Sequence, residues 1–170
     1  YCPMQLPAIL VSDLHLTDSP KDEYRWGLFP WLVDESKHEQ VRTVVIAGDL
    51  TDAKDYHPSR LVQRIVDNIL LVRRSLGDGG RVEILMGNHD YLRRGHAFFA
   101  FLSQFEGVRF ITEPCDDGVE QAGPLALFLP HTKTPVADWS GMDLSHYSYV
   151  FMHQTAPGSV ASNGQKMDGE

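Results

Sequence analysis

The sequence contains only two cysteines, Cys2 and Cys115, and no long apolar run. Two cysteines are too few for a disulfide framework, and neither belongs to a Cys-x-x-Cys pair that would bind zinc or exchange electrons. No apolar segment approaches the roughly 20 residues that span a bilayer, and no charged segment followed by a cleavable apolar stretch begins the chain. We therefore expect a cytoplasmic protein without a membrane partner.

Basic residues are also scarce, because 15 Lys and Arg stand against 23 Asp and Glu, for a net charge of -8. Binding to the backbone of nucleic acid usually needs a basic face, so this charge disfavours a broad nucleic-acid surface. Cations bound to some of the carboxylates would reduce the negative field at a metal site. The sequence leaves the oligomeric state open.

The composition is that of a globular protein, with 42% hydrophobic and 22% charged residues. A chain of 170 residues can bury a sizeable core, and it contains no repeat and no linker rich in Gly, Ser or Pro. We expect a single domain over residues 1–170, with its core in 7–153 and a loop or tail in 155–170.

Short apolar runs of strand length alternate with helical patterns along the chain. The clearest helix lies between Pro58 and Leu76, where Leu61, Ile65 and Ile69 recur at helical spacing before Gly77. Strands are predicted at 7–12, 43–47, 81–86 and 149–152, more weakly at 108–111 and 125–129, and shorter helices at 22–35 and 96–105. The pattern predicts an α/β layered fold with helices covering a central sheet.

Polar side chains follow four of the predicted strands. These segments are Ser12-Asp13-Leu14-His15, Gly48-Asp49-Leu50-Thr51-Asp52, Gly87-Asn88-His89-Asp90 and the single residue His153. Ligands of α/β proteins tend to lie at the carboxyl ends of strands, so we expect these residues to meet at one edge of one sheet. Carboxylate, amide and imidazole groups together suit divalent manganese, iron or zinc.

The spacing within these segments has physical reasons. On an extended backbone Asp13 and His15 point to the same side, while Leu14 points into the core. Gly48 and Gly87 allow a sharp turn and a close approach to a bound ion. Each motif alone is also explained by a turn or a helix cap, whereas four of them in this order indicate a metal site.

This set of motifs resembles the calcineurin-like metallophosphoesterases, a superfamily of phosphatases, cyclic-nucleotide phosphodiesterases and DNA-repair exonucleases. The resemblance covers most of residues 7–153 and implies a layered fold of central β-sheets flanked by helices. It implies that Asp13 and His15 hold one metal ion, that Asn88 and His153 hold another, and that Asp49 bridges the two. His89, oriented by Asp90, would protonate the leaving oxygen.

The chemistry implied by this resemblance is phosphoester hydrolysis with two divalent ions. A hydroxide held between the ions would attack phosphorus while the metals neutralise charge on the phosphoryl oxygens. Manganese is the first expectation for the metal, with iron and zinc as alternatives. The expected substrate is a phosphoester, with a nucleotide or DNA among the candidates.

One departure from the family pattern concerns the end of the sequence. Relatives continue past the position of His153 to a Gly-His-x-His element, which is not found in the 17 residues that follow His153 here. We interpret this as a C-terminal truncation without the final strands. On this interpretation each ion loses one imidazole ligand, and metal binding weakens.

Two residues outside the motifs are candidates for substrate binding. Arg93, with Arg94 beside it, follows the third motif and carries a guanidinium that matches phosphate oxygens; two solvated arginines are the plain alternative. His131 follows the predicted strand 125–129 and could reach the metal ligands, although a histidine beside a proline is often a surface or cap residue.

Three functions agree with these features. The leading prediction is a phosphodiesterase or phosphatase, with diesters preferred because the Gly-Asn-His-Asp motif resembles that of both the diesterase and the exonuclease branches. A DNA exonuclease is the second, weakened by the acidic charge. The third is a scaffold protein that keeps the fold but is catalytically impaired.

Overall fold

The computed structural model describes residues 4–93, 95–117, 125–155, 158 and 160. Four parallel strands form the first sheet in the order β1-β2-β3-β4, with bounds Ala8–Val11, Thr43–Ala47, Arg81–Leu85 and Val108–Ile111. A second sheet has the order β5-β6-β7, with bounds Cys115–Asp116, Ala126–Leu129 and Tyr149–Met152. Within it, β5 is antiparallel to β6 and β6 is parallel to β7.

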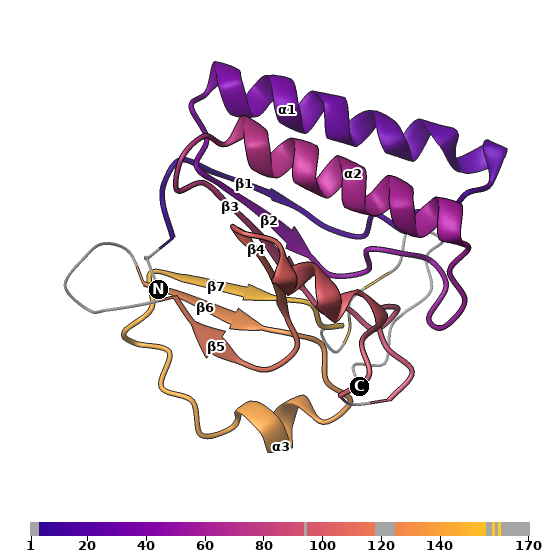
Figure 1. The fold of residues 1–170 in the computed structure, drawn as a ribbon. Coiled ribbons are helices and arrows are strands. Elements are labelled where there is room, and N and C mark those ends of the chain that lie inside the picture. Colours follow the sequence, from indigo (N-terminus) through magenta and orange to yellow (C-terminus); the bar gives the residue numbers. More distant parts are fainter. Residues whose placement is uncertain (1–3, 94, 118–124, 156–157, 159, 161–170) are drawn as a thin grey trace.

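Two helices, α1 (Leu28–His38) and α2 (Ser59–Ser75), lie along one face of the first sheet, and the second sheet lies on the other side (Figure 1). The predicted fold class is therefore confirmed. The prediction of helix at 22–35 is refined, because a 3-10 helix, η1 (Pro20–Gly27), precedes α1. The predicted helix at 96–105 is also a 3-10 helix, η2 (Phe98–Gln104). Strand β5 and the short helix α3 (Pro135–Trp139) were not predicted.

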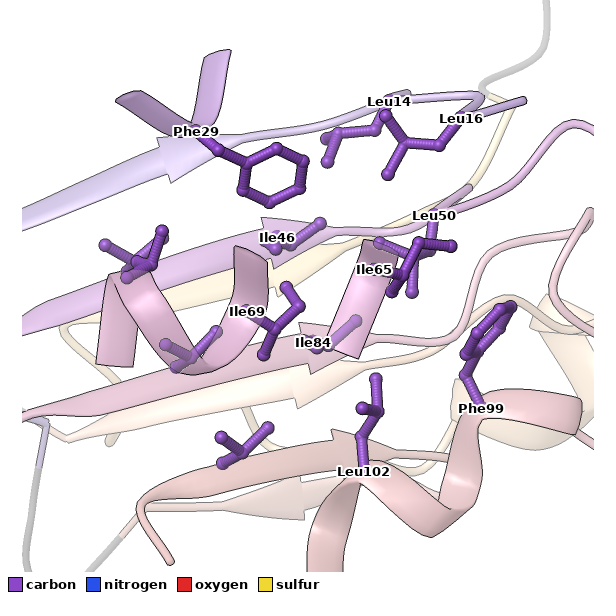
Figure 2. Close-up of a cluster of buried hydrophobic side chains, with 14 of the residues drawn as sticks. Leu14, Leu16, Phe29, Ile46, Leu50, Ile65, Ile69, Ile84, Phe99 and Leu102 are labelled. Carbon is purple, nitrogen blue, oxygen red and sulfur yellow. The ribbon is translucent and has the colours of Figure 1, made fainter. Parts of the chain in front are cut away.

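The main core lies between the helices and the first sheet. Ile65 and Ile69 of α2 are fully buried and lie over Ile46 and Ile84 of the sheet (Figure 2). A smaller cluster joins the two sheets, and it includes Val45, Leu85 and Ile111 with Ala126 and Phe128. Apolar side chains on both faces of β2 and β3 explain why these strands read as continuous apolar runs. Burial on both faces fixes β2 and β3, whose carboxyl ends carry two of the polar motifs.

The expectation that four strands of one sheet deliver the polar motifs is wrong in one respect. Strands β1, β2 and β3 belong to the first sheet, whereas β7, which precedes His153, belongs to the second. The carboxyl ends of the two sheets are nevertheless joined: the His131 N–H donates to the Met86 carbonyl at 2.8 Å, and the His153 Nδ1–H donates to the Ala47 carbonyl at 2.7 Å. The motifs therefore meet where the two sheets converge.

Among the helices of the described residues, none combines the length and apolar content that a bilayer crossing requires. The predicted loop or tail at 155–170 lies outside the described residues, apart from positions 155, 158 and 160.

Candidate metal centre

The loop after β1 presents Asp13 and His15 in a left-handed backbone conformation. Their φ angles are +55° and +43°, so the expectation of an extended backbone is wrong at both positions. The loop is held because the Asp13 N–H donates to the Gly48 carbonyl at 3.2 Å and the His15 N–H donates to the Asp49 carbonyl at 2.9 Å. Leu14 is buried between them, and the His15 Nε2 lies 4.0 Å from the Asp13 Oδ1. The side chains of Asp13 and His15 therefore lie close together as predicted, but through a left-handed rather than an extended backbone.

Asp49 lies at the centre of the cluster, with only 3% of its surface exposed and a φ of +53°. Its Oδ1 accepts a hydrogen bond from the His89 N–H at 2.9 Å. Its Oδ2 lies 3.6 Å from the His15 Nε2 and 3.5 Å from the His153 Nε2. One carboxylate oxygen therefore stands between imidazoles that come from the loops after β1 and β7.

His153 also contacts Asn88. The His153 Nε2 lies 3.1 Å from the Asn88 Oδ1. The Nδ1 must donate its hydrogen bond, because its partner is the carbonyl oxygen of Ala47. A histidine whose Nδ1–H is held by a backbone carbonyl offers its Nε2 to a metal, as metal-ligating imidazoles commonly do.

The acid–base properties of this pair follow from their contact. Burial alone would lower the pKa of His153, but the hydrogen bonds to Asp49 and the Ala47 carbonyl raise that pKa to about 9. For Asp49, burial opposes ionisation, yet the contacts with His153 and the His89 N–H lower its pKa. Without metal, the cluster therefore keeps a proton on His153 beside an ionised Asp49.

Metal binding should consequently compete with this proton. Below pH 9 the affinity for Mn²⁺ should rise by up to about tenfold per pH unit, because His153 must lose one proton to become a ligand. The stability of the metal-free chain should instead fall as the pH rises. The stabilisation from protonated His153 is complete below the ordinary pKa of 6.5 and is lost as the pH rises through about 9. Calorimetric Mn²⁺ titrations and urea unfolding in chelator between pH 6 and 9.5 measure both trends. An affinity independent of pH would contradict the role of His153.

Asp90 has a different position from the one expected. Its carboxylate accepts hydrogen bonds from the backbone amides of Gly87 at 2.7 Å, Asp49 at 3.0 Å and Leu50 at 2.9 Å. Burial, together with the charge of Asp49, raises its pKa to about 6 despite these bonds. The expectation that Asp90 orients His89 is therefore wrong: Asp90 ties the loop after β3 to the loop after β2, which positions Asp49.

His89 is instead held by the loop after β2. Its Nδ1 donates to the Asp52 carbonyl at 2.7 Å, and its ring lies edge-on to that of His15, with centroids 4.9 Å apart. The Asp52 carboxylate lies 3.5 Å from the His15 Nδ1, on the opposite side of the ring from the candidate metal-binding Nε2. Our sequence reasoning assigned no role to Asp52, although its place in Gly-Asp-Leu-Thr-Asp was a usable signal.

The donor atoms fit divalent cations. Carboxylate oxygens of Asp13 and Asp49, the amide oxygen of Asn88 and the imidazoles of His15 and His153 converge, and these are ligands that Mn²⁺, Fe²⁺ and Zn²⁺ accept. The acidic groups gather at one place where bound cations would relieve their repulsion. The five ligand roles remain predictions that this convergence supports.

Two glycines leave room for the cluster. A Cβ on Gly48, which has a φ of +90°, would overlap the His153 ring, and a Cβ on Gly87 would overlap the Asp49 carboxylate and backbone nitrogen. The Gly87→Ala variant should therefore lose about 1–3 kcal/mol of unfolding free energy and most of its Mn²⁺ affinity, because Asp49 must move. Urea unfolding and Mn²⁺ titration check this. Gly27→Ala, where an added Cβ meets nothing within 4 Å, is the matched control; equal behaviour of the two variants would contradict the expectation.

The two candidate substrate-binding residues, Arg93 and His131, line the same cavity beside the metal cluster. His131 is buried and its Nδ1 lies 2.9 Å from the Tyr91 hydroxyl, while its ring centroid lies 6.3 Å from that of His153. Arg93 is exposed at the cavity. Arg94 lies outside the described residues.

Comparison with known proteins agrees with this geometry. A search of curated proteins gave no match. The sequence profile of the family described as calcineurin-like phosphoesterase matches residues 6–155, which contain both sheets and every residue of the cluster. Because the match covers most of the 170 residues, the chain belongs to the calcineurin-like phosphoesterases, a family of metal-dependent enzymes.

Proposed function

We propose that the protein hydrolyses phosphodiesters and phosphomonoesters with two divalent cations, Mn²⁺ before Fe²⁺ or Zn²⁺. The observation that carries this proposal is the position of the Asp49 Oδ2, 3.6 Å from the His15 Nε2 and 3.5 Å from the His153 Nε2. Asp13 and His15 would hold one ion, Asn88 and His153 the other, with Asp49 shared. When bound, the cations would neutralise charge on the phosphoryl oxygens and acidify water to supply a nucleophile near neutral pH.

The residues around the ligands have separate tasks in this proposal. Asp52, 3.5 Å from the His15 Nδ1, would orient that ring by its charge, and Asp90 positions Asp49 through the backbone amides. The His89 Nδ1–H is committed to the Asp52 carbonyl, so His89 would give a proton to the leaving oxygen from its Nε2 in the imidazolium form, and the neutral ring would keep its Nδ1–H. The protein groups thus supply a positioned acid beside a cluster that binds cations.

The acid role of His89 is tested with two leaving groups. The His89→Ala variant should lower kcat by about 10²–10⁴-fold for an alkyl leaving group, which needs a proton, and much less for p-nitrophenol, which leaves as an anion. Rates for an alkyl ester and a p-nitrophenyl ester of the same phosphate measure this difference. His146→Ala, a change at an exposed histidine, is the control.

Each outcome of that test has a meaning. Activity that survives His89→Ala with both leaving groups would contradict the catalytic assignment. An equal loss with both would contradict proton donation while leaving hydrolysis intact. Absence of Mn²⁺-dependent hydrolysis in the unchanged protein would favour a scaffold, whereas nucleotide release from linear DNA would favour the exonuclease branch.

A further inference from the structure

A cavity of about 330 Å³ adjoins the metal cluster on the side of Asn88 and His153. Met86, the residue before Gly87-Asn88, forms part of its wall, and so does His131, whose ring centroid lies 6.3 Å from that of His153. The His131 N–H donates to the Met86 carbonyl at 2.8 Å, which joins these two wall residues. The cavity wall therefore lies close to Asn88 and His153, two of the predicted metal ligands.

The lining of this cavity suits a flat, uncharged ring. Two aromatic side chains, Tyr91 and Trp139, line it together with apolar groups that include Met86 and Pro130. Tyr91 is buried and its hydroxyl lies 2.9 Å from the His131 Nδ1, so the orientation of its ring is held. Aromatic side chains bind nucleobases by stacking, without preference for one base. The volume of the cavity is at the small end of the range of ligand pockets, about 300–1,000 Å³, and suits a single nucleoside rather than a longer chain.

The charges at the cavity argue against a second phosphate in it. Arg93 and Lys133 line the cavity, but so do Glu113 and Asp138, and the four formal charges balance. Asp138 also accepts a hydrogen bond from the Thr134 hydroxyl at 3.1 Å. A neutral group is therefore better suited to this cavity than an anion, and the single phosphate of the ligand is left to the metal cluster.

The position of the candidate acid decides which part of a substrate the cavity would take. His89 lies beside His15, with ring centroids 4.9 Å apart, whereas the cavity lies beside His153. The Asp49 Oδ2 lies within 3.6 Å of the Nε2 atoms of both His15 and His153, so it links the two imidazoles. Because His89 would protonate the leaving oxygen, the leaving group belongs beside His89. The cavity beside His153 would then take the other ester arm, which stays on phosphorus.

We propose that this cavity binds the nucleoside arm of a phosphodiester, the arm that remains on the phosphate after hydrolysis. As a substrate pocket it rests on the proposed phosphodiesterase function, whereas its affinity for a nucleoside does not. The preferred substrates are then diesters of nucleoside monophosphates. Simple alkyl or aryl diesters lack the group that fills the cavity.

The first test compares two esters with one leaving group, thymidine 5′-(p-nitrophenyl) phosphate and methyl p-nitrophenyl phosphate. In both, water adds to phosphorus, the bond to p-nitrophenol breaks, and thymidine or methyl monophosphate is the other product. Trp139→Ala should lower kcat/KM for the thymidine ester about tenfold or more and leave the methyl ester unchanged. Trp31→Ala, at a half-exposed tryptophan of α1, is the matched control and should alter neither rate.

The second test needs neither metal nor activity. Thymidine is titrated into the metal-free ¹⁵N-labelled chain, and the indole N–H signals of its three tryptophans are followed. The Trp139 signal, assigned with Trp139→Ala, should shift and saturate, while those of Trp26 and Trp31 should stay in place.

The outcomes separate this inference from the proposed function. A Trp139 signal that does not respond to thymidine, with equal kcat/KM for the two esters, would overturn the nucleoside pocket while hydrolysis itself stands. A saturating shift in a protein that hydrolyses neither ester would overturn the phosphodiesterase proposal and retain the nucleoside site.

Discussion

Asp49→Asn is expected to lower kcat/KM for phosphodiester hydrolysis by at least about a thousandfold, because charge stabilisation by metals contributes several kcal/mol to the transition state. The change removes the negative charge and the Oδ2 that lies within 3.6 Å of both the His15 and His153 imidazoles. The Asn side chain keeps an oxygen to accept the His89 N–H, so the loop after β3 retains its hydrogen bond. The loss should therefore come from metal binding rather than from unfolding.

Two comparisons make this prediction specific. Asp34→Asn, on the exposed face of α1, should leave kcat/KM unchanged. Asp13→Asn should have a smaller effect than Asp49→Asn, because the Asp13 side chain is 57% exposed whereas that of Asp49 is 4% exposed. Steady-state rates with saturating Mn²⁺ and a circular dichroism spectrum of each variant are required. An Asp49→Asn protein that retains folded structure and more than about a tenth of the wild-type rate would contradict the shared-ligand role.

Asp90→Ala is expected to have the largest effect on stability, a loss of about 3–5 kcal/mol of unfolding free energy, comparable to breaking a buried ion pair. The Asp90 side chain is 2% exposed and accepts hydrogen bonds from three backbone amides. Alanine leaves those amides buried without an acceptor, at a cost of about 1–3 kcal/mol for each that water does not reach. Since the raised pKa of Asp90 shows that its charge is disfavoured by burial, the net loss is smaller than the sum.

Urea unfolding in chelator measures this loss without a contribution from metal. Asp34→Ala serves as the control, because surface substitutions away from special features usually change stability by at most about 0.5 kcal/mol. Asp90→Asn should be intermediate, since one amide oxygen remains and its NH₂ group faces backbone donors. If Asp90→Ala unfolds within about 1 kcal/mol of the control, the carboxylate does not join the two loops as described.

Much of the fold was predictable because it depends on local pattern. The apolar run at 43–47 coincides with β2, and the helix predicted at 58–76 corresponds to α2, Ser59–Ser75. The helical period of α2 is clear because one face of it is buried in the core, and the apolar run of β2 is continuous because both faces of that strand are buried. Strand β5, with two residues, and helix α3, with five, are too short to show a period.

The structure brings the predicted site residues together, but their arrangement was not predictable from the sequence. Sequence order places His153 after a strand, but it does not say that β7 pairs with β6 in a second sheet. The left-handed φ angles of Asp13 and His15 follow from hydrogen bonds to the loop after β2, which are tertiary contacts. For the same reason the sequence could not place the Asp90 carboxylate on the amides of Asp49 and Leu50. Local motifs indicate which groups are present, and packing decides what each one contacts.

Anomalous diffraction from crystals of the protein saturated with Mn²⁺ tests the metal centre most directly. The account predicts a peak on each side of the Asp49 carboxylate, one beside Asp13 and His15 and the other beside Asn88 and His153. The chain offers a competing group of potential ligands, Glu35, His38 and Glu39, at the exposed end of α1. Peaks at that group, with none in contact with Asp49, would contradict the account.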